Sequence, residues 1–228
     1  MEFPLRINKY LRDTQATTRK KADELVSAGR VLVNGSRAVL GMQISASDKV
    51  EVRGEKSRSH AYLAYYKPRG LPTQAPKGVA SVITEWAGKG LFPIGRLDKE
   101  SEGLLILTDD GRVANWLLGA KSGVEKEYLV KVREKLRAGV TTIFSRGMNT
   151  EPFGKLLPAE AKILAPHLLS VILHEGKKHQ IRVMLAELGY TIERLKRVRV
   201  GKFQLKNLKP GETRKLDKAE WADFFGAQ

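Results

Sequence analysis

The sequence predicts an α+β protein with a small N-terminal domain, residues 1–54, and a larger domain, residues 60–228. The first part combines two short helical segments with a strong hairpin signal. Residues 55–59 are polar throughout and indicate a linker. In the second part, short apolar or alternating runs predict strands that are separated by short helices.

The protein is strongly basic. Its 228 residues carry 41 Lys and Arg against 25 Asp and Glu, a net charge of +16 with an isoelectric point near 10.0. Such a charge predicts a polyanionic partner, and the 13 Lys and Arg against 5 Asp and Glu between His174 and Lys218 favour a nucleic-acid-binding face. No apolar run approaches the ~20 residues needed to cross a membrane, so we expect no membrane contact.

The residue types available limit the chemistry. The chain has no cysteine, which excludes disulfides and thiolate metal sites and fits a cytoplasmic protein. Its four histidines are scattered without metal-ligand spacing, and the sequence has no nucleotide-phosphate loop. We therefore expect neither a metal nor a cofactor.

The N-terminal domain shows clear local signals. Apolar residues at helical spacing from Leu5 to Leu11 predict a short first helix, and a threonine-rich segment caps a second helix over about residues 19–28. Gly29 ends that helix, and the following Val31–Val33 predicts a strand. The dipeptide Asn34-Gly35 predicts a tight hairpin turn after it.

Cations occupy the first turn of the second helix, where they oppose the helix dipole, and a bound phosphate would explain them. The patterns RINKYL, TRKKADELVSAGRVLVNGSRA and DKVEV resemble the small alpha-L RNA-binding domain first known from a small-subunit ribosomal protein. The resemblance implies that five basic side chains face RNA: Arg6, Lys9, Arg19, Lys20 and Arg30.

The second domain is organised around a charged loop and the strand after it. The apolar run Leu104–Leu107 is too short for an ordinary helix and predicts a buried strand. The loop from Gly95 to Gly103 precedes it, and polar loops on rigid strands usually display catalytic groups. Among the three acids of this loop, only Asp98 follows an apolar residue, Leu97, that can anchor the loop in the core.

Residues 133–165 give little signal beyond a possible helix. The other expected elements, in order, are a strand at 61–66, a helical turn around 79–86, a helix at 112–118, strands at 125–132 and 168–174, a helix ending at 188, strands at 195–200 and 203–208, and a C-terminal helix around 218–225.

The segment GRLDKESEGLLILTDDG closely resembles the active-site motif of pseudouridine synthases. The similarity is to the branch that modifies ribosomal RNA and carries an extra N-terminal RNA-binding domain, the RsuA/RluB/RluE/RluF family. YYKPRG, EKEYLVKV and EGKKHQIRVMLAELGY resemble further motifs of the same family. The resemblance implies a catalytic domain with a mostly antiparallel mixed sheet flanked by helices.

The resemblance also implies roles for single residues. Asp98 would be the catalytic nucleophile, Tyr128 would stack on the target uracil, and Arg182 would form an ion pair with Asp98. Tyr128 also fits a core aromatic, and His179 could be considered as a general base. We further expect RNA contacts from Lys67, Arg96, Lys178, His179 and Gln180.

Two positions depart from the family pattern: Tyr66 stands where an asparagine often occurs, and Val183 where many relatives have a second arginine. The first departure affects RNA contacts or packing more than chemistry. The second removes a contact to RNA or to the scaffold.

The implied reaction breaks the C1'–N1 bond of a uridine and joins C5 to C1'. It needs one ionised carboxylate as nucleophile, at C6 or at C1', and a neighbouring arginine keeps such an acid charged. The implied partner is RNA, foremost ribosomal RNA or a ribosomal subunit precursor, and we expect a monomer.

Two alternatives stay open. One is a catalytically silent RNA-binding or ribosome-assembly protein, against which the intact set of Asp98, Tyr128 and Arg182 argues. The other is a nucleosidase-type hydrolase, in which Glu100 or Glu102 would supply the second carboxylate.

Overall fold

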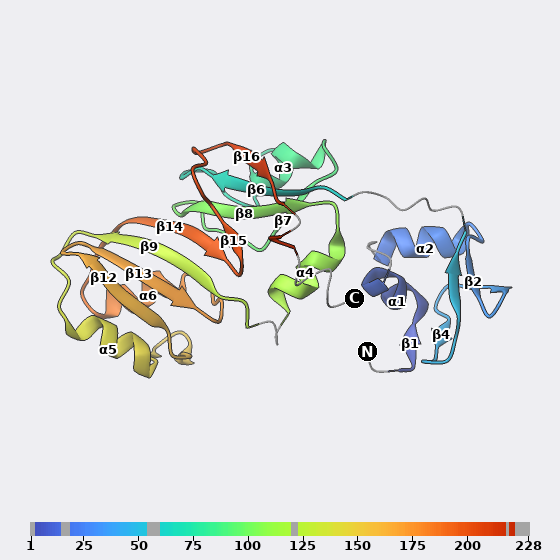
Figure 1. Cartoon of the computed structure of the whole chain (residues 1–228), viewed down its shortest axis with the longest axis horizontal. Helices are drawn as coiled ribbons and strands as arrows, with labels where there is room; N and C mark the ends of the chain where they lie inside the picture. The colour runs from blue at the N-terminus through green and yellow to red at the C-terminus, as the bar shows by residue number, and fades with distance from the viewer. Residues whose placement is uncertain (1–2, 15–18, 54–59, 120–122, 218, 222–228) are drawn as a thin grey trace. The chain divides into compact units, whose positions relative to one another are not determined.

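The computed structural model describes residues 3–14, 19–53, 60–119, 123–217 and 219–221 (Figure 1). They divide into two compact units, one of residues 1–61 with 108–116 and one of residues 62–107 with 117–228. The predicted linker at 55–59 and most of the predicted C-terminal helix lie outside the described residues. No helix in the described part of the chain is long and apolar enough to span a membrane.

The N-terminal unit is a small α+β assembly. In it, β2 is the central strand of an antiparallel sheet of order β3-β2-β5, and β1 pairs with β4. Its elements are β1 (Leu5–Arg6), α1 (Ile7–Thr14), α2 (Arg19–Ser27), β2 (Val31–Val33), β3 (Ser36–Arg37), β4 (Gln43–Ile44) and β5 (Val50–Val52).

Local sequence signals account for most of this unit. The hairpin between β2 and β3 turns at Asn34 and Gly35, with φ of 52° and 81°, as a type I′ turn requires. The first helix starts at Ile7 and not at Leu5, because Leu5 pairs with Ile44 as part of β1. The prediction of its start was therefore wrong by two residues, since strand pairing is not visible in local spacing.

The second unit is built on a nine-stranded mixed sheet. Its strands are β6 (Tyr62–Lys67), β7 (Phe92–Ile94), β8 (Glu102–Thr108), β9 (Lys126–Val132), β12 (Glu160–Ala165), β13 (Leu168–Leu173), β14 (Ile192–Val200), β15 (Phe203–Gln204) and β16 (Thr213–Lys215). The helices are α3 (Val82–Ala87), α5 (Gly139–Arg146) and α6 (Gln180–Glu187), and a separate short pair is formed by β10 (Asn149–Thr150) and β11 (Gly154–Lys155).

The order of the sheet is β12-β13-β9-β14-β8-β6-β16, with β15 on β14 and β7 on β8. Pairing is antiparallel from β12 through β14 and between β6 and β16, whereas β14 and β8 run parallel. The predicted α+β class with a mostly antiparallel mixed sheet is confirmed. The helix α4 (Gly111–Leu118) follows β8 as expected and spans the division between the two units.

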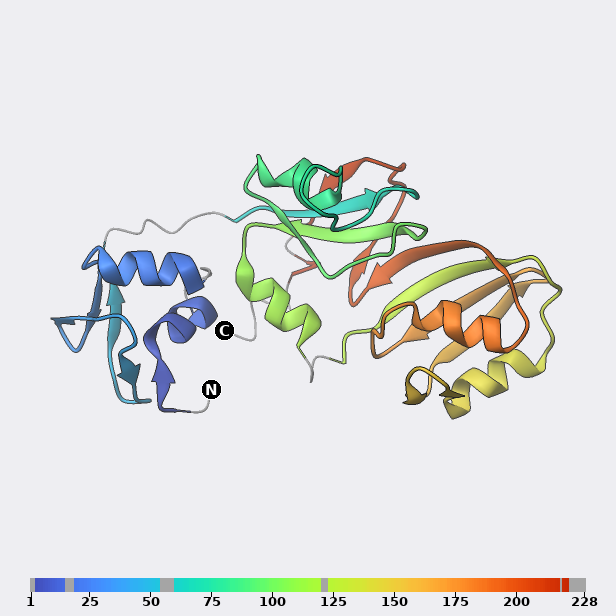
Figure 2. The ribbon, with the colours of Figure 1, turned by 180° about the vertical axis from the view of Figure 1, so that it is seen from behind.

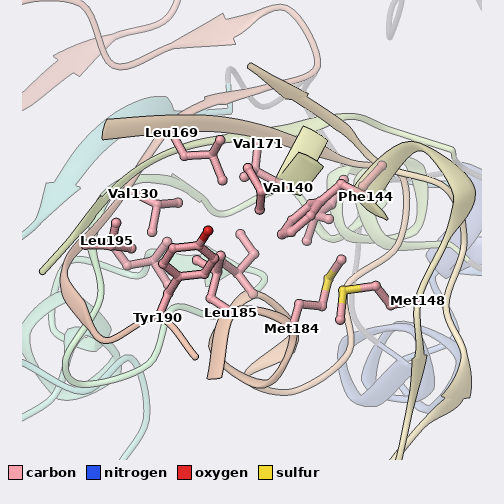
Figure 3. Close-up of a cluster of buried hydrophobic side chains, with 14 of the residues drawn as sticks. Val130, Val140, Phe144, Met148, Leu169, Val171, Met184, Leu185, Tyr190 and Leu195 are labelled. Atoms are coloured by element: carbon pink, nitrogen blue, oxygen red, sulfur yellow. The ribbon is translucent and has the colours of Figure 1, made fainter. Parts of the chain in front are cut away.

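Helices α5 and α6 cover the same face of β9, β12 and β13 (Figure 2). Figure 3 shows the core between them, where side chains of the strands and of both helices point toward one another. The labelled residues are Val130, Val140, Phe144, Met148, Leu169, Val171, Met184, Leu185, Tyr190 and Leu195, all of them buried. This core fixes α6, and therefore the side chains at its N-terminus.

Gly103 lets β8 approach β14 closely. It lies opposite Arg197 in the parallel pairing, with φ of +108°, and a Cβ atom there would lie 2.2 Å from the Arg197 carbonyl oxygen. Only glycine fits such a position. The glycine at the end of the charged loop thus has a packing role in the sheet.

Candidate active site

The loop that carries Asp98 connects β7 to β8 and is firmly anchored. Leu97 is 7% exposed and packs in a cluster with Tyr65, which confirms that it holds the loop to the core. The Thr73 hydroxyl accepts a hydrogen bond from the Leu97 amide at 3.0 Å and donates one to the Leu97 carbonyl at 2.7 Å. The Ser101 amide donates to the Asp98 carbonyl at 3.0 Å, so the backbone turns tightly after Asp98.

The carboxylate of Asp98 faces the start of α6. Its Oδ1 lies 3.2 Å from Nε2 of His179, and the two side chains are 33% and 46% exposed. His179 is the N-cap residue of α6 and has a left-handed backbone with φ of 60°. The carboxylate of Asp98 therefore lies at the N-terminal end of α6.

Arg182 reaches the same loop but not Asp98 itself. Its Nη2 donates to the carbonyl of Glu100 and to Oγ of Ser101, both at 3.1 Å. Within the described residues, the expected ion pair between Asp98 and Arg182 is not formed. The reason is that the guanidinium is engaged by the part of the loop just beyond Asp98.

Lys67 is buried at a position where the sequence predicted an RNA contact. The side chain is fully buried at the end of β6, and its ammonium group donates to the carbonyls of Pro68 (2.9 Å), Leu71 (2.6 Å) and Lys99 (3.5 Å). In the described conformation this ammonium group bonds to backbone carbonyls, and the RNA contact of Lys67 stays a prediction. Burial lowers the pKa of Lys67 to about 8, although the nearby carboxylate of Asp98 opposes that shift.

Tyr128 lies in β9, half-buried, between two hydrophobic clusters. It packs against the core under α5 and α6 and also against the cluster that contains Leu97. Its neighbours in the sheet are Val171 on β13 and Arg197 on β14. The side chain therefore lies among the residues that anchor the Asp98 loop, and the role in stacking on uracil remains a prediction.

The other two acids of the loop are tied to arginines. Glu100 accepts a hydrogen bond from Arg69 at 3.1 Å. Glu102 is buried, accepts a hydrogen bond from Tyr66 at 3.0 Å, and forms a close ion pair with Arg194. Burial alone would raise the pKa of Glu102, but the hydrogen bonds from Arg194 and Tyr66 outweigh it and hold the pKa below its usual value. Glu102 therefore lacks the free carboxylate that a second catalytic acid needs, whereas Glu100 is held only by an exposed ion pair with Arg69.

Tyr66, which stands where the family pattern often has asparagine, has local contacts of its own. Its hydroxyl donates to Glu102, and the ammonium of Lys196 lies 5.1 Å from the centre of its ring. Tyr66 lies in β6, and its side chain is buried and has a polar partner in Glu102.

The remaining predicted RNA contacts differ in accessibility. Gln180 is buried, accepts a hydrogen bond from the Lys177 amide and donates one to Glu175 at 2.9 Å, so it shapes the loop before α6. Its RNA contact stays a prediction. The Nε of Arg30, which is half-buried, donates to the carbonyl of Arg53. The exposed members of the set are Arg6, Lys9, Arg19, Lys20, Arg96, Lys178 and His179.

Part of the basic C-terminal region is internal structure. Arg194 pairs with Glu102, Arg199 with Glu125 and Glu127, and Arg214 with Glu220. Arg197, on the same strand as the first two, is buried beside the Asp98 loop. The density of positive charge between 174 and 218 therefore overstates the RNA-facing surface, because the local charge pattern does not show which cations have partners.

One group of side chains could in principle hold a metal ion. The ligand atoms of Glu125, Glu160 and His174 lie within 4.8 Å of one another. Glu125 is already paired with Arg199 at 2.8 Å, and none of the three belongs to the Asp98 loop.

Both parts of the chain match known protein families. Residues 61–187 match the RNA pseudouridylate synthase family, and residues 5–50 match the S4 domain. The dual-specificity RNA pseudouridine synthase RluF of Escherichia coli (strain K12) is 34% identical, over 97% of this chain and 78% of the relative. The ribosomal large subunit pseudouridine synthase B of Bacillus subtilis (strain 168) is also 34% identical, over 92% of this chain and 91% of the relative.

A solved structure agrees with the sequence matches. The crystal structure of a pseudouridylate synthase superposes with a TM-score of 0.70 at 27% identity, covering 95% of this chain and 97% of that one. The similarity therefore extends over both the N-terminal unit and the sheet that carries Asp98.

Proposed function

Because this chain belongs to the RNA pseudouridylate synthase family, we propose that it isomerises a uridine of ribosomal RNA to pseudouridine with Asp98 as the nucleophile. Family membership establishes the activity, the isomerisation of uridine within RNA. The roles of individual residues and the ribosomal target are the proposal.

The reaction needs little beyond a positioned carboxylate. The glycosidic bond from C1' to N1 breaks, the base turns, C5 bonds to C1', and the hydrogen on C5 leaves as a proton while N1 gains one. A carboxylate nucleophile divides this exchange into two easier steps. The uridine must first leave its stack, at a cost of a few kcal/mol that the pocket has to offset.

The geometry suits Asp98 for this role. It is the acid of its loop whose carboxylate is not fixed to an arginine, since Glu100 is held by Arg69 and Glu102 by Arg194. Its partner His179 is nearly half exposed and can be displaced by bound RNA. This availability of Asp98, on a loop that is otherwise anchored on both sides, is the observation that carries the proposal.

Arg182 and Tyr128 would complete the site. The described contacts of Arg182 use only Nη2, so Nε and Nη1 can reach toward Asp98 or the substrate when the base enters. Contacts of this kind often tighten only in the substrate complex. Tyr128, half-buried beside the loop anchor, would provide the aromatic surface on which a flipped base stacks.

Ribosomal RNA is the favoured substrate because the relative from Bacillus subtilis is named for the large ribosomal subunit and because the S4 match covers the N-terminal unit. The exposed cations Arg6, Lys9, Arg19 and Lys20 would supply phosphate contacts. A ribosomal target would place the protein in the cytoplasm, where we propose that it acts as a monomer.

Release of tritium tests the reaction class. With RNA that carries tritium at C5 of uridine, the protein should release tritium into water without freeing uracil and without added metal or nucleotide. Free uracil would indicate hydrolysis, and the absence of reaction on all cellular RNA would indicate a silent binder. Mapping pseudouridines in ribosomal RNA from cells with and without the protein then tests the ribosomal target.

A further inference from the structure

Arg197 is a buried cation that has no acidic partner among the described residues. It lies in the middle of β14 and is 5% exposed. In the described part of the chain, no carboxylate oxygen lies within 4.0 Å of its guanidinium. The neighbouring arginines on the strand do have acidic partners, since Arg194 pairs with Glu102, and Arg199 pairs with Glu127 of β9.

The guanidinium of Arg197 instead contacts the backbone at both ends of the Asp98 loop. Its Nε donates to the carbonyl of Leu104 at 2.8 Å, in the strand that follows the loop. Its Nη1 lies 3.4 Å from the carbonyl of Arg96, two residues before Asp98. One side chain thus links the strand that supports the loop to the segment that leads into Asp98.

The sheet fixes Arg197 on the side of the predicted uracil contact. It lies directly opposite Tyr128 on β9 and opposite Gly103 on β8, and paired residues project from the same face of a sheet. The close approach at Gly103 leaves no room for the backbone of Arg197 to shift toward β8.

Stability alone does not explain an arginine at this position. A buried guanidinium loses its hydration, and an apolar residue of similar length would avoid that cost. Burial, joined by the charge of Arg197, also lowers the pKa of the nearby Lys67 and Lys126. The position therefore accumulates positive charge at a cost to the fold, a pattern that is typical of functional sites.

We propose that Arg197 is a positioning residue that holds the Asp98 loop in the geometry required for attack on the uridine. The inference rests on the proposed role of Asp98 and adds a residue from a distant strand to the machinery around it. Arg197 acts through the loop backbone and needs no contact with the substrate. Misplacement of a reacting group by roughly 1 Å can lower a rate by about 100-fold, which sets the size of the expected effect.

The test compares Arg197→Met, Arg197→Lys and the control Arg199→Met in the full-length protein. Arg199 is on the same strand, and its replacement also removes polar interactions, but these are with Glu125, Glu127 and Gly201 and not with the loop. For each variant, the single-turnover rate at saturating RNA, the Kd for RNA and the melting temperature are measured.

Arg197→Met should lower the single-turnover rate by about 100-fold and leave the Kd within about threefold of the parent. Arg197→Lys should recover only part of the rate, because a single ammonium group cannot replace the planar guanidinium that contacts both carbonyls. Arg199→Met should keep its rate within about threefold even where its melting temperature falls as far as that of Arg197→Met.

A rate for Arg197→Met within about threefold of the parent would overturn the proposal, as would an equal loss of rate in Arg199→Met at the same melting temperature. If Arg197→Met does not fold, Arg197→Lys decides, and a parental rate in it contradicts the positioning role. Turnover by Asp98→Asn would refute the role of Asp98 itself, whichever way the Arg197 variants behave.

Discussion

The Oδ1 atom of Asp98 lies 3.2 Å from Nε2 of His179, the residue that begins helix α6 with a left-handed backbone. The proposed nucleophile is thus paired, in the free protein, with an exposed histidine rather than with Arg182. This relationship separates two contributions of position 179, the side chain that meets Asp98 and the backbone that starts the helix.

Replacement of His179 should separate these contributions. Asparagine tolerates φ near 60°, whereas a β-branched residue is strained there by about 1–2 kcal/mol. We expect His179→Asn to fold like the parent and to turn over within about tenfold of it, because positioning and not proton transfer is lost. His179→Val should have a lower free energy of unfolding in urea than His179→Asn. Equal stability of the two variants, or loss of turnover in His179→Asn, would contradict this account.

Substitution of Arg182 should impair the chemical step. Arg182→Ala removes the donor to Glu100 and Ser101 together with its positive charge, so the single-turnover rate should fall by about 100-fold or more. Arg182→Lys should rescue the rate only in part, because lysine lacks the planar guanidinium with its several N–H donors. Ser101→Ala, which removes one acceptor and leaves the charge, is the matched control and should stay within about tenfold. A parental rate in Arg182→Ala would exclude its role.

The burial of Lys67 predicts a specific pH dependence of stability. Its pKa is lowered from 10.5 to about 8, so between these values the unfolded chain binds a proton that the folded chain has released. The free energy of unfolding therefore rises with pH between about 8 and 10.5, and it decreases as the pH falls toward 8. Relative to Lys67→Met, the free energy of unfolding of the parent should rise by up to about 1.4 kcal/mol per pH unit in this range. Urea unfolding of both proteins measures it, and a difference that is constant with pH would contradict the burial of an ammonium group.

The sequence predicted those features whose signals are local. The hairpin at Asn34-Gly35, the buried strand at Leu104–Leu107 and the anchoring by Leu97 all follow from turn chemistry or from short apolar runs. The position of α2 likewise follows from its apolar face, whereas the predicted threonine-rich cap lies outside the described residues. These elements require no knowledge of distant parts of the chain.

The features that sequence missed depend on distant partners. The basic run of β14 suggests an exposed strand, yet β14 lies between β9 and β8 with Leu195 and Arg197 buried. The burial of Lys67 depends on carbonyls that a proline turn and the Asp98 loop bring together. Charge pattern alone cannot show that these cations bond to backbone oxygens rather than to phosphates, because the oxygens belong to other segments of the fold.

The N-terminal cations should affect binding and not chemistry. Arg19 and Lys20 are exposed in the first turn of α2, where anions are favoured by the helix dipole. The double change Arg19→Gln and Lys20→Gln should lower the slope of log Kd against log salt by roughly 0.7 to 0.9 for each phosphate that is no longer neutralised, with an unchanged rate at saturating RNA. Lys49→Gln is the matched control, because Lys49 is paired with Glu51 at 2.8 Å in the same unit. An unchanged salt slope in the double variant would show that these two side chains do not contact RNA phosphates.

The most direct measurement for the account as a whole is the single-turnover release of C5 tritium by Asp98→Asn at saturating RNA. Asparagine keeps the size of the side chain and removes its charge, so release should fall to background while the Kd for RNA and the melting temperature stay near those of the parent. Glu100→Gln, on the same loop, removes a carboxylate already paired with Arg69 and should retain release within about threefold. Release by Asp98→Asn within about tenfold of the parent would show that Asp98 is not the nucleophile.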